Sequence, residues 1–196
     1  MSALRRVCVF CGSSSGRSPA YLEAARGLGA LLAGREIELV FGGGRVGLMG
    51  AIADEVLARG GRAIGVIPRG LLEREVGHTG LSELLVVDSM HERKARMAEL
   101  SDAFVALPGG FGTFEELCEV ITWAQLGIHP KPCALFDVQN YWDPLARLFD
   151  QAVEEGFVEP RFRALVLRES DPERLLEALS AHRAPQVPRW ITRDES

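Results

Sequence analysis

The segment LPGGFGTFEEL, Leu107–Leu117, combines residue types that bind a phosphate with a nearby acid. It follows an apolar run, Ala103–Leu107, that predicts a buried strand, and a helical pattern begins directly after it. Glycines let backbone N–H groups approach an anion closely, and a helix amino terminus adds a partial positive charge. The carboxylate of Glu116 follows one turn later. The segment therefore predicts chemistry on a nucleotide and not binding alone.

Glu116 also has a purely structural interpretation. Thr113-x-x-Glu116 has the spacing of a capping box, in which both side chains bond to the N–H groups that begin a helix. The pattern alone leaves the catalytic and the capping interpretation open.

The segment DSMHERKARM, Asp88–Met97, is the second informative stretch. Ser89-x-x-Glu92 is a capping box and predicts a helix start. Its spacing then puts four residues on one face of this helix, and they are Met90, Arg93, Lys94 and Met97. Two cations on a partly apolar face are either a pair at its edge with solvated heads, or a clamp for an anion.

Two further glycine-rich turns follow apolar runs, at Cys11–Gly16 and at Phe41–Gly50. If the runs are parallel strands, all three turns lie at the same edge of a sheet, where open α/β folds bind ligands. Gly42-x-Gly44-x-x-Gly47 also matches a dinucleotide fingerprint. That match follows the second strand, and the next strand ends in IGVIPRG without the acid that would hold an adenine ribose. We therefore expect no nicotinamide cofactor.

Short apolar runs alternate with amphipathic segments along the chain, which favours a parallel sheet covered on both faces. We expect an α/β, Rossmann-like three-layer fold with a mainly parallel sheet of about six or seven strands. The expected strands are 7–11, 38–41, 62–67, 84–87, 103–107, 133–136 and 164–167, and the expected helices are 19–33, 48–59, 90–100, 113–126, 142–155 and 172–181. Residues 70–81 suggest an irregular segment. We expect one domain over residues 1–182 and a loose tail over 183–196.

Bulk composition excludes several classes of protein. The net charge is −5, from 22 basic and 27 acidic residues, which argues against a nucleic-acid partner. Apolar runs are too short to span a bilayer, so we expect a cytoplasmic protein without membrane association. Cys8 and Cys11 point to opposite faces of a strand, and we expect them, Cys118 and Cys133 to be core residues. No metal-ligand spacing is present in the sequence, and we expect no nucleophile elbow.

At this point the chain resembles a known family. PGGFGTFEE matches the pattern PGGxGTxxE, and SMHERK matches an accompanying MxxRK-type helix. Both are similar to motifs of the LOG ("lonely guy") family, the cytokinin riboside 5′-monophosphate phosphoribohydrolases, over residues 7–158. Many members were formerly labelled lysine decarboxylases. This chain has two lysines, Lys94 and Lys131, and neither has the context of a pyridoxal phosphate Schiff base.

The resemblance implies hydrolysis of the N-glycosidic bond of a purine nucleoside 5′-monophosphate, with N6-modified adenosine monophosphates and AMP as substrates and with no metal or cofactor. It implies that Arg93 and Glu116 are the catalytic pair. The residues that it implies for substrate binding, besides these two, are Ser13, Gly43, Gly44, Glu75, Met90, Lys94, Gly109, Gly110, Phe111, Gly112, Thr113, Phe114, Glu115 and Thr122.

Assembly and the exact reaction are further expectations. The resemblance to the shorter family members implies a homodimer, and apolar residues such as Trp123 and Leu126 are expected near the active edge, where they could face a partner. A nucleotide or cofactor carrier on the same fold stays open as a second class of function. So does a broader nucleosidase or nucleotidase that accepts several monophosphates.

Overall fold

The computed structural model describes residues 4–72 and 77–185. They form a seven-stranded sheet in the order β4-β3-β2-β1-β5-β6-β7, in which every pair of neighbours is parallel. The strands are β1 (Arg6–Phe10), β2 (Glu38–Phe41), β3 (Ala63–Pro68), β4 (Glu83–Val87), β5 (Ala103–Ala106), β6 (Cys133–Phe136) and β7 (Val166–Glu169). The expected α/β fold with a parallel sheet is confirmed.

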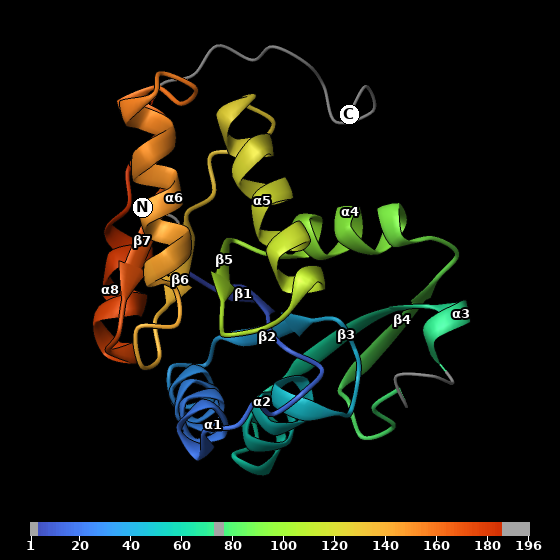
Figure 1. The fold of residues 1–196 in the computed structure, drawn as a ribbon. Coiled ribbons are helices and arrows are strands. Elements are labelled where there is room, and N and C mark those ends of the chain that lie inside the picture. The colour runs from blue at the N-terminus through green and yellow to red at the C-terminus, as the bar shows by residue number, and fades with distance from the viewer. Residues whose placement is uncertain (1–3, 73–76, 186–196) are drawn as a thin grey trace.

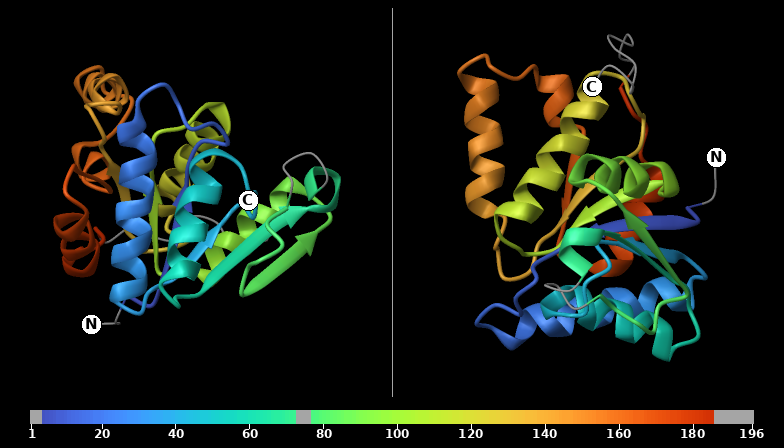
Figure 2. Two further views of the ribbon diagram at one scale, coloured as in Figure 1. Left: turned by 90° about the horizontal axis from the view of Figure 1, so that it is seen from below. Right: turned by 90° about the vertical axis from the view of Figure 1, so that its right-hand side faces the viewer.

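Helices cover both faces of the sheet and give the expected three layers (Figure 1, Figure 2). On one face lie α1 (Pro19–Gly34), α2 (Gly47–Ala58) and α8 (Pro172–Ala181). On the other lie α4 (Met90–Leu100) and α5 (Phe111–Gln125), with α6 (Asp143–Glu154) beside α5. The two short helices are α3 (Arg69–Leu72) and α7 (Pro160–Arg163).

Local sequence explains where the long helices begin. Ser18 caps α1 by accepting a hydrogen bond from the Ala20 N–H at 3.3 Å, and Pro19 occupies the first helical position. Ser89 caps α4 by accepting from the Glu92 N–H at 3.1 Å. The predicted capping box of α4 is confirmed in this respect, which fixes the register that points Arg93 inward.

The core lies in the central strands, which are buried on both faces. Val7 and Val9 pack under α1 and α2, whereas Cys8 and Phe10 pack under α4 and α5. Cys8, Cys11 and Cys133 are buried free thiols, as expected. The expectation for Cys118 is wrong, because this thiol is exposed on α5.

Two structural expectations concern the ends of elements and the tail. Trp123 lies in the last turn of α5 and Leu126 is its C-cap, so both lie at the far end of the helix that begins at the active edge. The expectation that they lie near that edge is wrong. α8 ends at Ala181, and residues 186–196 of the expected tail lie outside the described residues, so the boundary at residue 182 stays a prediction. Among the described residues, no helix is long and apolar enough to cross a membrane.

Candidate active site

The strand order reverses beside β1, and this point locates a crevice. β2 and β5 flank β1, and the chain leaves the carboxyl ends of β1 and β5 into the turns at Cys11–Gly16 and Pro108–Gly110. The Gly12 N–H donates to the Pro108 carbonyl at 3.1 Å, and the Leu48 N–H donates to the Gly12 carbonyl at 3.0 Å. These bonds join the first turn to the other two. The predicted convergence of the three glycine-rich turns is therefore confirmed.

A cavity of about 210 Å³ lies at this crevice, and we call it the Arg93–Glu116 cavity. Its lining combines a cation, a carboxylate, hydroxyl groups and the first turn of α5. The lining residues are Cys11, Gly12, Ser13, Met49, Arg93, Gly110, Phe111, Gly112, Thr113 and Glu116. The structure thus brings together both predicted catalytic residues and five of the predicted binding residues, Ser13, Gly110, Phe111, Gly112 and Thr113.

The start of α5 decides between the two interpretations of Glu116. The helix begins at Phe111, and its N-cap is Gly110, which provides no side-chain hydrogen bond. Thr113 is therefore the third residue of the helix and is buried, with Glu116 in the following turn. The capping-box interpretation of Thr113 and Glu116 is wrong. The first-turn N–H groups of α5 carry no side-chain cap and face the cavity end of the helix, where an anion is stabilised.

Position 109, in the turn before α5, has no space for a side chain. A Cβ atom at this position would lie 2.1 Å from Thr113 Oγ1 and 2.9 Å from the Gly12 N. The backbone of the turn can approach both neighbours only because position 109 has no side chain.

Arg93 is 5% exposed and is held by backbone carbonyl groups. Its Nε donates to the Val66 carbonyl at 3.0 Å, and its Nη2 donates to the Gly42 carbonyl at 2.9 Å. A Cβ atom on Gly42 would lie 2.0 Å from Arg93 Nη2. The first glycine of the apparent dinucleotide fingerprint is therefore explained by the approach of an arginine side chain. Arg93 is therefore not a solvated cation at the edge of a helix, because backbone carbonyl groups hold its guanidinium in a buried position.

The electrostatic field in the cavity is set partly by Glu116. Burial raises the pKa of the Cys11 thiol well above its ordinary value, and the charge of Glu116 raises it further. The same two causes, in the same order, raise the pKa of Cys8. Neither thiol is therefore a nucleophile near neutral pH, because nucleophilic attack requires the thiolate. Glu116 is the acid–base group that this wall of the cavity offers.

Lys94, a predicted binding residue, follows Arg93 on α4, and its implied ligand role stays a prediction. Among the described residues, it lies outside the lining of the Arg93–Glu116 cavity. Its Nζ donates to Glu115 Oε1 at 2.5 Å and to Glu119 Oε1 at 2.9 Å, both on α5. Glu115, another predicted binding residue, thus lies in an ion pair with Lys94.

A second cavity, of about 320 Å³, adjoins the first and shares Gly12, Ser13 and Gly110 with it. Tyr21, Tyr141 and Gly109 also line it, and we call it the Tyr141 cavity. The Tyr141 hydroxyl donates a hydrogen bond to the Gly109 carbonyl. The sequence interpretation missed Tyr141. It follows β6, so the rule that ligands bind at the carboxyl ends of parallel strands could have found it.

The remaining predicted residues surround the site or lie apart from it. Gly43 and Gly44 lie in the turn after β2, where Gly43 O accepts from the His78 N–H at 3.0 Å. Met90 Sδ accepts from Arg93 Nη1 at 3.7 Å. Phe114 packs edge-on against Trp142.

Thr122 lies about three turns along α5, where its hydroxyl donates to the Cys118 carbonyl at 2.7 Å. Glu75 lies outside the described residues. The ligand roles implied for these two residues, as for the other predicted site residues, stay predictions.

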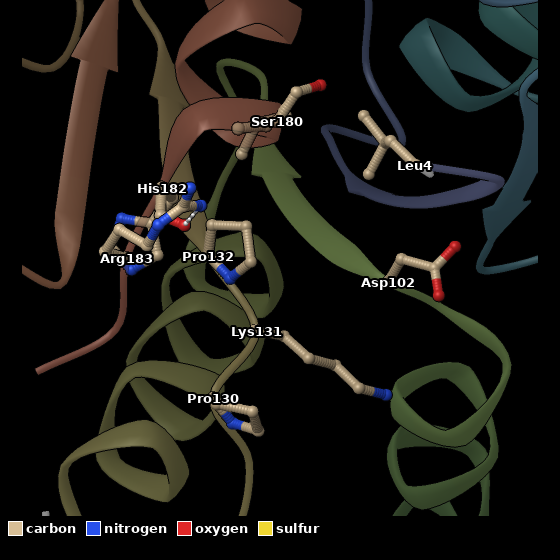
Figure 3. Close-up of a pocket in the computed structure, with 9 residues that line it drawn as sticks. Leu4, Asp102, Pro130, Lys131, Pro132, Ser180, His182 and Arg183 are labelled. Carbon is tan, nitrogen blue, oxygen red and sulfur yellow. Dashed lines mark hydrogen bonds between the residues drawn. The ribbon is translucent and has the colours of Figure 1, made fainter. Parts of the chain in front are cut away.

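A hollow of about 290 Å³ at the opposite edge of the sheet is a poorer candidate (Figure 3). It is lined by Leu4, Asp102, Pro130, Lys131, Pro132, Leu179, Ser180, His182 and Arg183. Lys131 Nζ donates to the Ala98 carbonyl at 2.6 Å, and Asp102 accepts from the N–H groups of Arg5 and Arg6. These polar groups hold the protein's own backbone. Across residues 4–72 and 77–185, no group of three His, Cys, Asp or Glu side chains could hold a metal ion.

Comparison with known proteins shows the family of this chain. The model of a family described as "Possible lysine decarboxylase" matches residues 49–179. The protein named probable cytokinin riboside 5′-monophosphate phosphoribohydrolase LOGL2, from Oryza sativa subsp. japonica, is 50% identical over 98% of this chain and 78% of its own length. LOG7 of Arabidopsis thaliana, named as the same enzyme, is 49% identical over 92% of this chain and 83% of its own. The chain belongs to the LOG family.

Solved structures place the LOG chain in a wider group of similar folds. The molybdenum cofactor binding protein of Rippkaea orientalis has a TM-score of 0.68 at 21% identity, covering 92% of this chain and 98% of its own. The Moco carrier protein of Chlamydomonas reinhardtii has a TM-score of 0.67 at 22% identity, covering 90% and 96%. At this level of identity the likeness shows the fold alone.

Proposed function

We propose that this chain hydrolyses the N-glycosidic bond of N6-modified adenosine 5′-monophosphates, as in cytokinin activation, and that AMP is also a substrate. The products are the free base and ribose 5-phosphate. The names of relatives about 50% identical over nearly the whole chain support the reaction. The observation that carries the proposal is that Glu116 and Arg93 line one cavity in front of the amino terminus of α5.

The reaction breaks the bond between C1′ of the ribose and the purine nitrogen. The bonding electron pair leaves with the base, and positive charge develops on the ribose ring. A carboxylate beside the sugar stabilises that charge and can accept a proton from the water that attacks C1′. We assign this role to Glu116. The departing base takes a proton from solvent, and Glu116 returns to solvent the proton that it accepted, so the net reaction consumes one water per bond broken.

The phosphate of the substrate has a matching place in the same cavity. The N–H groups of Phe111, Gly112 and Thr113 begin α5, and the helix dipole favours an anion there. Arg93 lines the cavity as a fixed cation, because the Val66 and Gly42 carbonyls orient its guanidinium. A fixed cation positions an anionic substrate with little loss of side-chain freedom.

We propose that the chain acts as a homodimer. Large apolar side chains are exposed around the active edge, and they include Val86, Met90 and Phe111, of which Phe111 is 89% exposed. Such a surface supports pairing with a second copy. Light scattering at micromolar concentration should give twice the chain mass of 21.4 kDa. A mass of one chain, or of six, would contradict the dimer.

Cytoplasmic location is also part of the proposal. Four free cysteines, three of them buried, support a reducing compartment. Cell fractionation of the tagged chain should recover it with cytosolic markers, and recovery from another compartment would contradict this location.

A product assay tests the reaction. The purified chain is incubated with AMP and with isopentenyl-AMP, and the base, nucleoside, phosphate and ribose 5-phosphate are separated by chromatography. We expect free base and ribose 5-phosphate in equal amounts. Release of inorganic phosphate with nucleoside would indicate a phosphatase instead.

The same assay distinguishes the remaining alternatives. AMP that binds without any product would favour a carrier, and calorimetry would detect that binding. CMP and UMP serve as comparison substrates, and their cleavage at rates similar to AMP would favour a broad nucleosidase over a purine-specific enzyme.

A further inference from the structure

Tyr141 lies in the turn between β6 and α6, and its hydroxyl holds the glycine turn that precedes α5. β5 and β6 are parallel neighbours in the sheet, so the turns that follow them meet at the same edge. The Tyr141 hydroxyl donates to the carbonyl of Gly109, 32 positions away in the sequence. Because a carbonyl oxygen only accepts, this bond needs the protonated hydroxyl. Burial raises the pKa of Tyr141, which keeps the proton in place.

The turn between β6 and α6 has a strained backbone. Gln139 and Asn140 both have positive φ angles, of 54° and 57°. The left-handed region is unfavourable for a residue with a side chain, and it persists only where surrounding contacts impose it. Here the buried carboxylate of Asp137 accepts from the Trp142 N–H at 3.0 Å and from Arg168 Nε at 2.7 Å. These contacts hold the chain on both sides of the strained pair.

Aromatic neighbours fix the orientation of the Tyr141 ring. The Trp142 side chain is 1% exposed and lies edge-on to it, with ring centroids 5.1 Å apart and planes at 87°. Tyr21, from α1, is also edge-on, at 6.0 Å and 79°. Edge-to-face pairs at these separations are favourable. The hydroxyl is therefore directed at Gly109 by the packing of the ring and not by the hydrogen bond alone.

This hydrogen bond sets the orientation of the Gly109–Gly110 peptide. The peptide is trans, so its C=O and its N–H point in opposite directions. A glycine on each side gives it the backbone freedom to flip. With the Gly109 carbonyl bonded to Tyr141, the Gly110 N–H points away from that hydroxyl, and Gly110 lines the Arg93–Glu116 cavity. A flipped peptide would replace this N–H by a carbonyl oxygen, which repels an anion.

We propose that Tyr141 is a positioning residue, which holds the Gly109–Gly110 peptide with its N–H available to the phosphate of the substrate. The inference rests on the proposed function, in which the start of α5 binds that phosphate. Tyr141 acts through the turn and not by contact with the reacting atoms. A tyrosine that only packs against Trp142 makes a different prediction, because loss of its hydroxyl would then leave phosphate affinity unchanged.

Tyr141→Phe removes the hydroxyl and keeps the ring. We expect the dissociation constant for ribose 5-phosphate, measured by calorimetry, to rise roughly tenfold or more, which is the scale of one hydrogen bond to a charged group. KM for AMP should rise by a similar factor with kcat within about threefold, since a phosphate contact is made in the ground state and the transition state alike. The inhibition constant of free adenine, which has no phosphate, should stay within about twofold.

Tyr21→Phe is the matched control. It removes a hydroxyl from the same Tyr141 cavity but leaves the bond between Tyr141 and Gly109 in place. We expect wild-type kinetics and wild-type affinity for ribose 5-phosphate from it. A melting curve of each variant separates a loss of folding from a loss of phosphate affinity.

Two results would overturn the positioning role. One is a Tyr141→Phe variant that binds ribose 5-phosphate within about twofold of the wild type. The other is a variant that loses kcat and stability while KM is unchanged. The binding measurement needs no turnover. A wild type that binds ribose 5-phosphate but releases no adenine would therefore contradict the proposed hydrolysis, and the comparison of affinities would still decide the role of Tyr141.

Discussion

Arg93 shows how one side chain is oriented before any substrate arrives. Its guanidinium donates to the carbonyls of Gly42, directly after β2, and of Val66, within β3, while it also lines the cavity. A planar group with several donors suits this double use, whereas a lysine would lose at least one of the bonds. The position of the cation is therefore set by the sheet and not only by α4.

Glu116→Gln tests the role that we assign to the carboxylate of Glu116. The change keeps the size of the side chain but removes its charge. We expect turnover to fall by roughly a hundredfold or more, which is the scale of losing one electrostatic or acid–base group. The thermal unfolding midpoint should change little, because Gly110 and not Thr113 caps α5. Steady-state kinetics and a melting curve of the same sample provide both measurements.

Arg96→Ala is the control for Glu116→Gln, since it alters an exposed charge on α4. We expect it to retain turnover. A Glu116→Gln variant with wild-type turnover would remove Glu116 from the mechanism.

Single residues were predicted unevenly from the sequence, for identifiable reasons. The roles of Arg93 and Glu116 as neighbours in one cavity followed from motifs that end at the same sheet edge. The direction of Lys94 could not be predicted, because adjacent positions on a helix differ by about 100° and the partners on α5 are distant in sequence. The sequence left the capping interpretation of Thr113 open, because a capping-box spacing fits any register of a helix start.

At the scale of elements, local sequence patterns such as helix caps and apolar runs were sufficient to predict the bounds of several helices and strands. The bounds of β2, β6, α4 and α8 agree with the expected ranges 38–41, 133–136, 90–100 and 172–181. The short helices α3 and α7 were not expected, because one turn of helix has no hydrophobic period to detect. The start of α5 at Phe111, two residues before the expected position, depends on the glycine turn and not on apolar spacing.

Gly42→Ala tests whether the turn after β2 must lack a side chain at position 42 so that Arg93 can approach it. The added methyl group would lie 2.0 Å from Arg93 Nη2, so the guanidinium must move. We expect kcat/KM for AMP to fall by at least about tenfold, because a displaced catalytic group loses its alignment. Kinetic measurement on the folded variant, checked by circular dichroism, provides the result.

Gly27→Ala on α1 is the matched control for Gly42→Ala, because a Cβ atom there meets nothing within 4 Å. It should keep activity and gain about 0.5–1 kcal/mol of stability, as alanine in a helix usually does. Equal activity for the two variants would contradict the steric argument.

For the whole molecule, buried thiols couple stability to alkaline pH. Burial raises the pKa of Cys133 to about 12, and it also raises the pKa of Cys8 and Cys11. A thiol whose pKa is higher in the folded state stabilises that state below the ordinary thiol pKa of about 8.5, and this contribution is lost as pH rises towards the folded value. We expect the free energy of unfolding to fall above about pH 9.

Cys133→Ala isolates one of these thiols. Each buried thiol contributes up to about 1.4 kcal/mol per pH unit between the two pKa values. Urea unfolding from pH 7.5 to 10.5 should therefore show a shallower decline for the variant than for the wild type. Parallel curves would mean that Cys133 ionises equally well in both states.

The position of β1 between β2 and β5 has a consequence for the order of events during synthesis. Val7 pairs with Leu39 on one side and with Ala103 on the other. A ribosome therefore delivers Arg93 and the first two glycine turns before the strand that leads to Glu116 exists. The nascent chain exposes one edge of β1 until β5 arrives, and closing that long-range pair is a slow type of folding step. A fragment that ends before β5 therefore lacks Glu116, to which we assign the stabilisation of the charged ribose, and it should release no base from AMP.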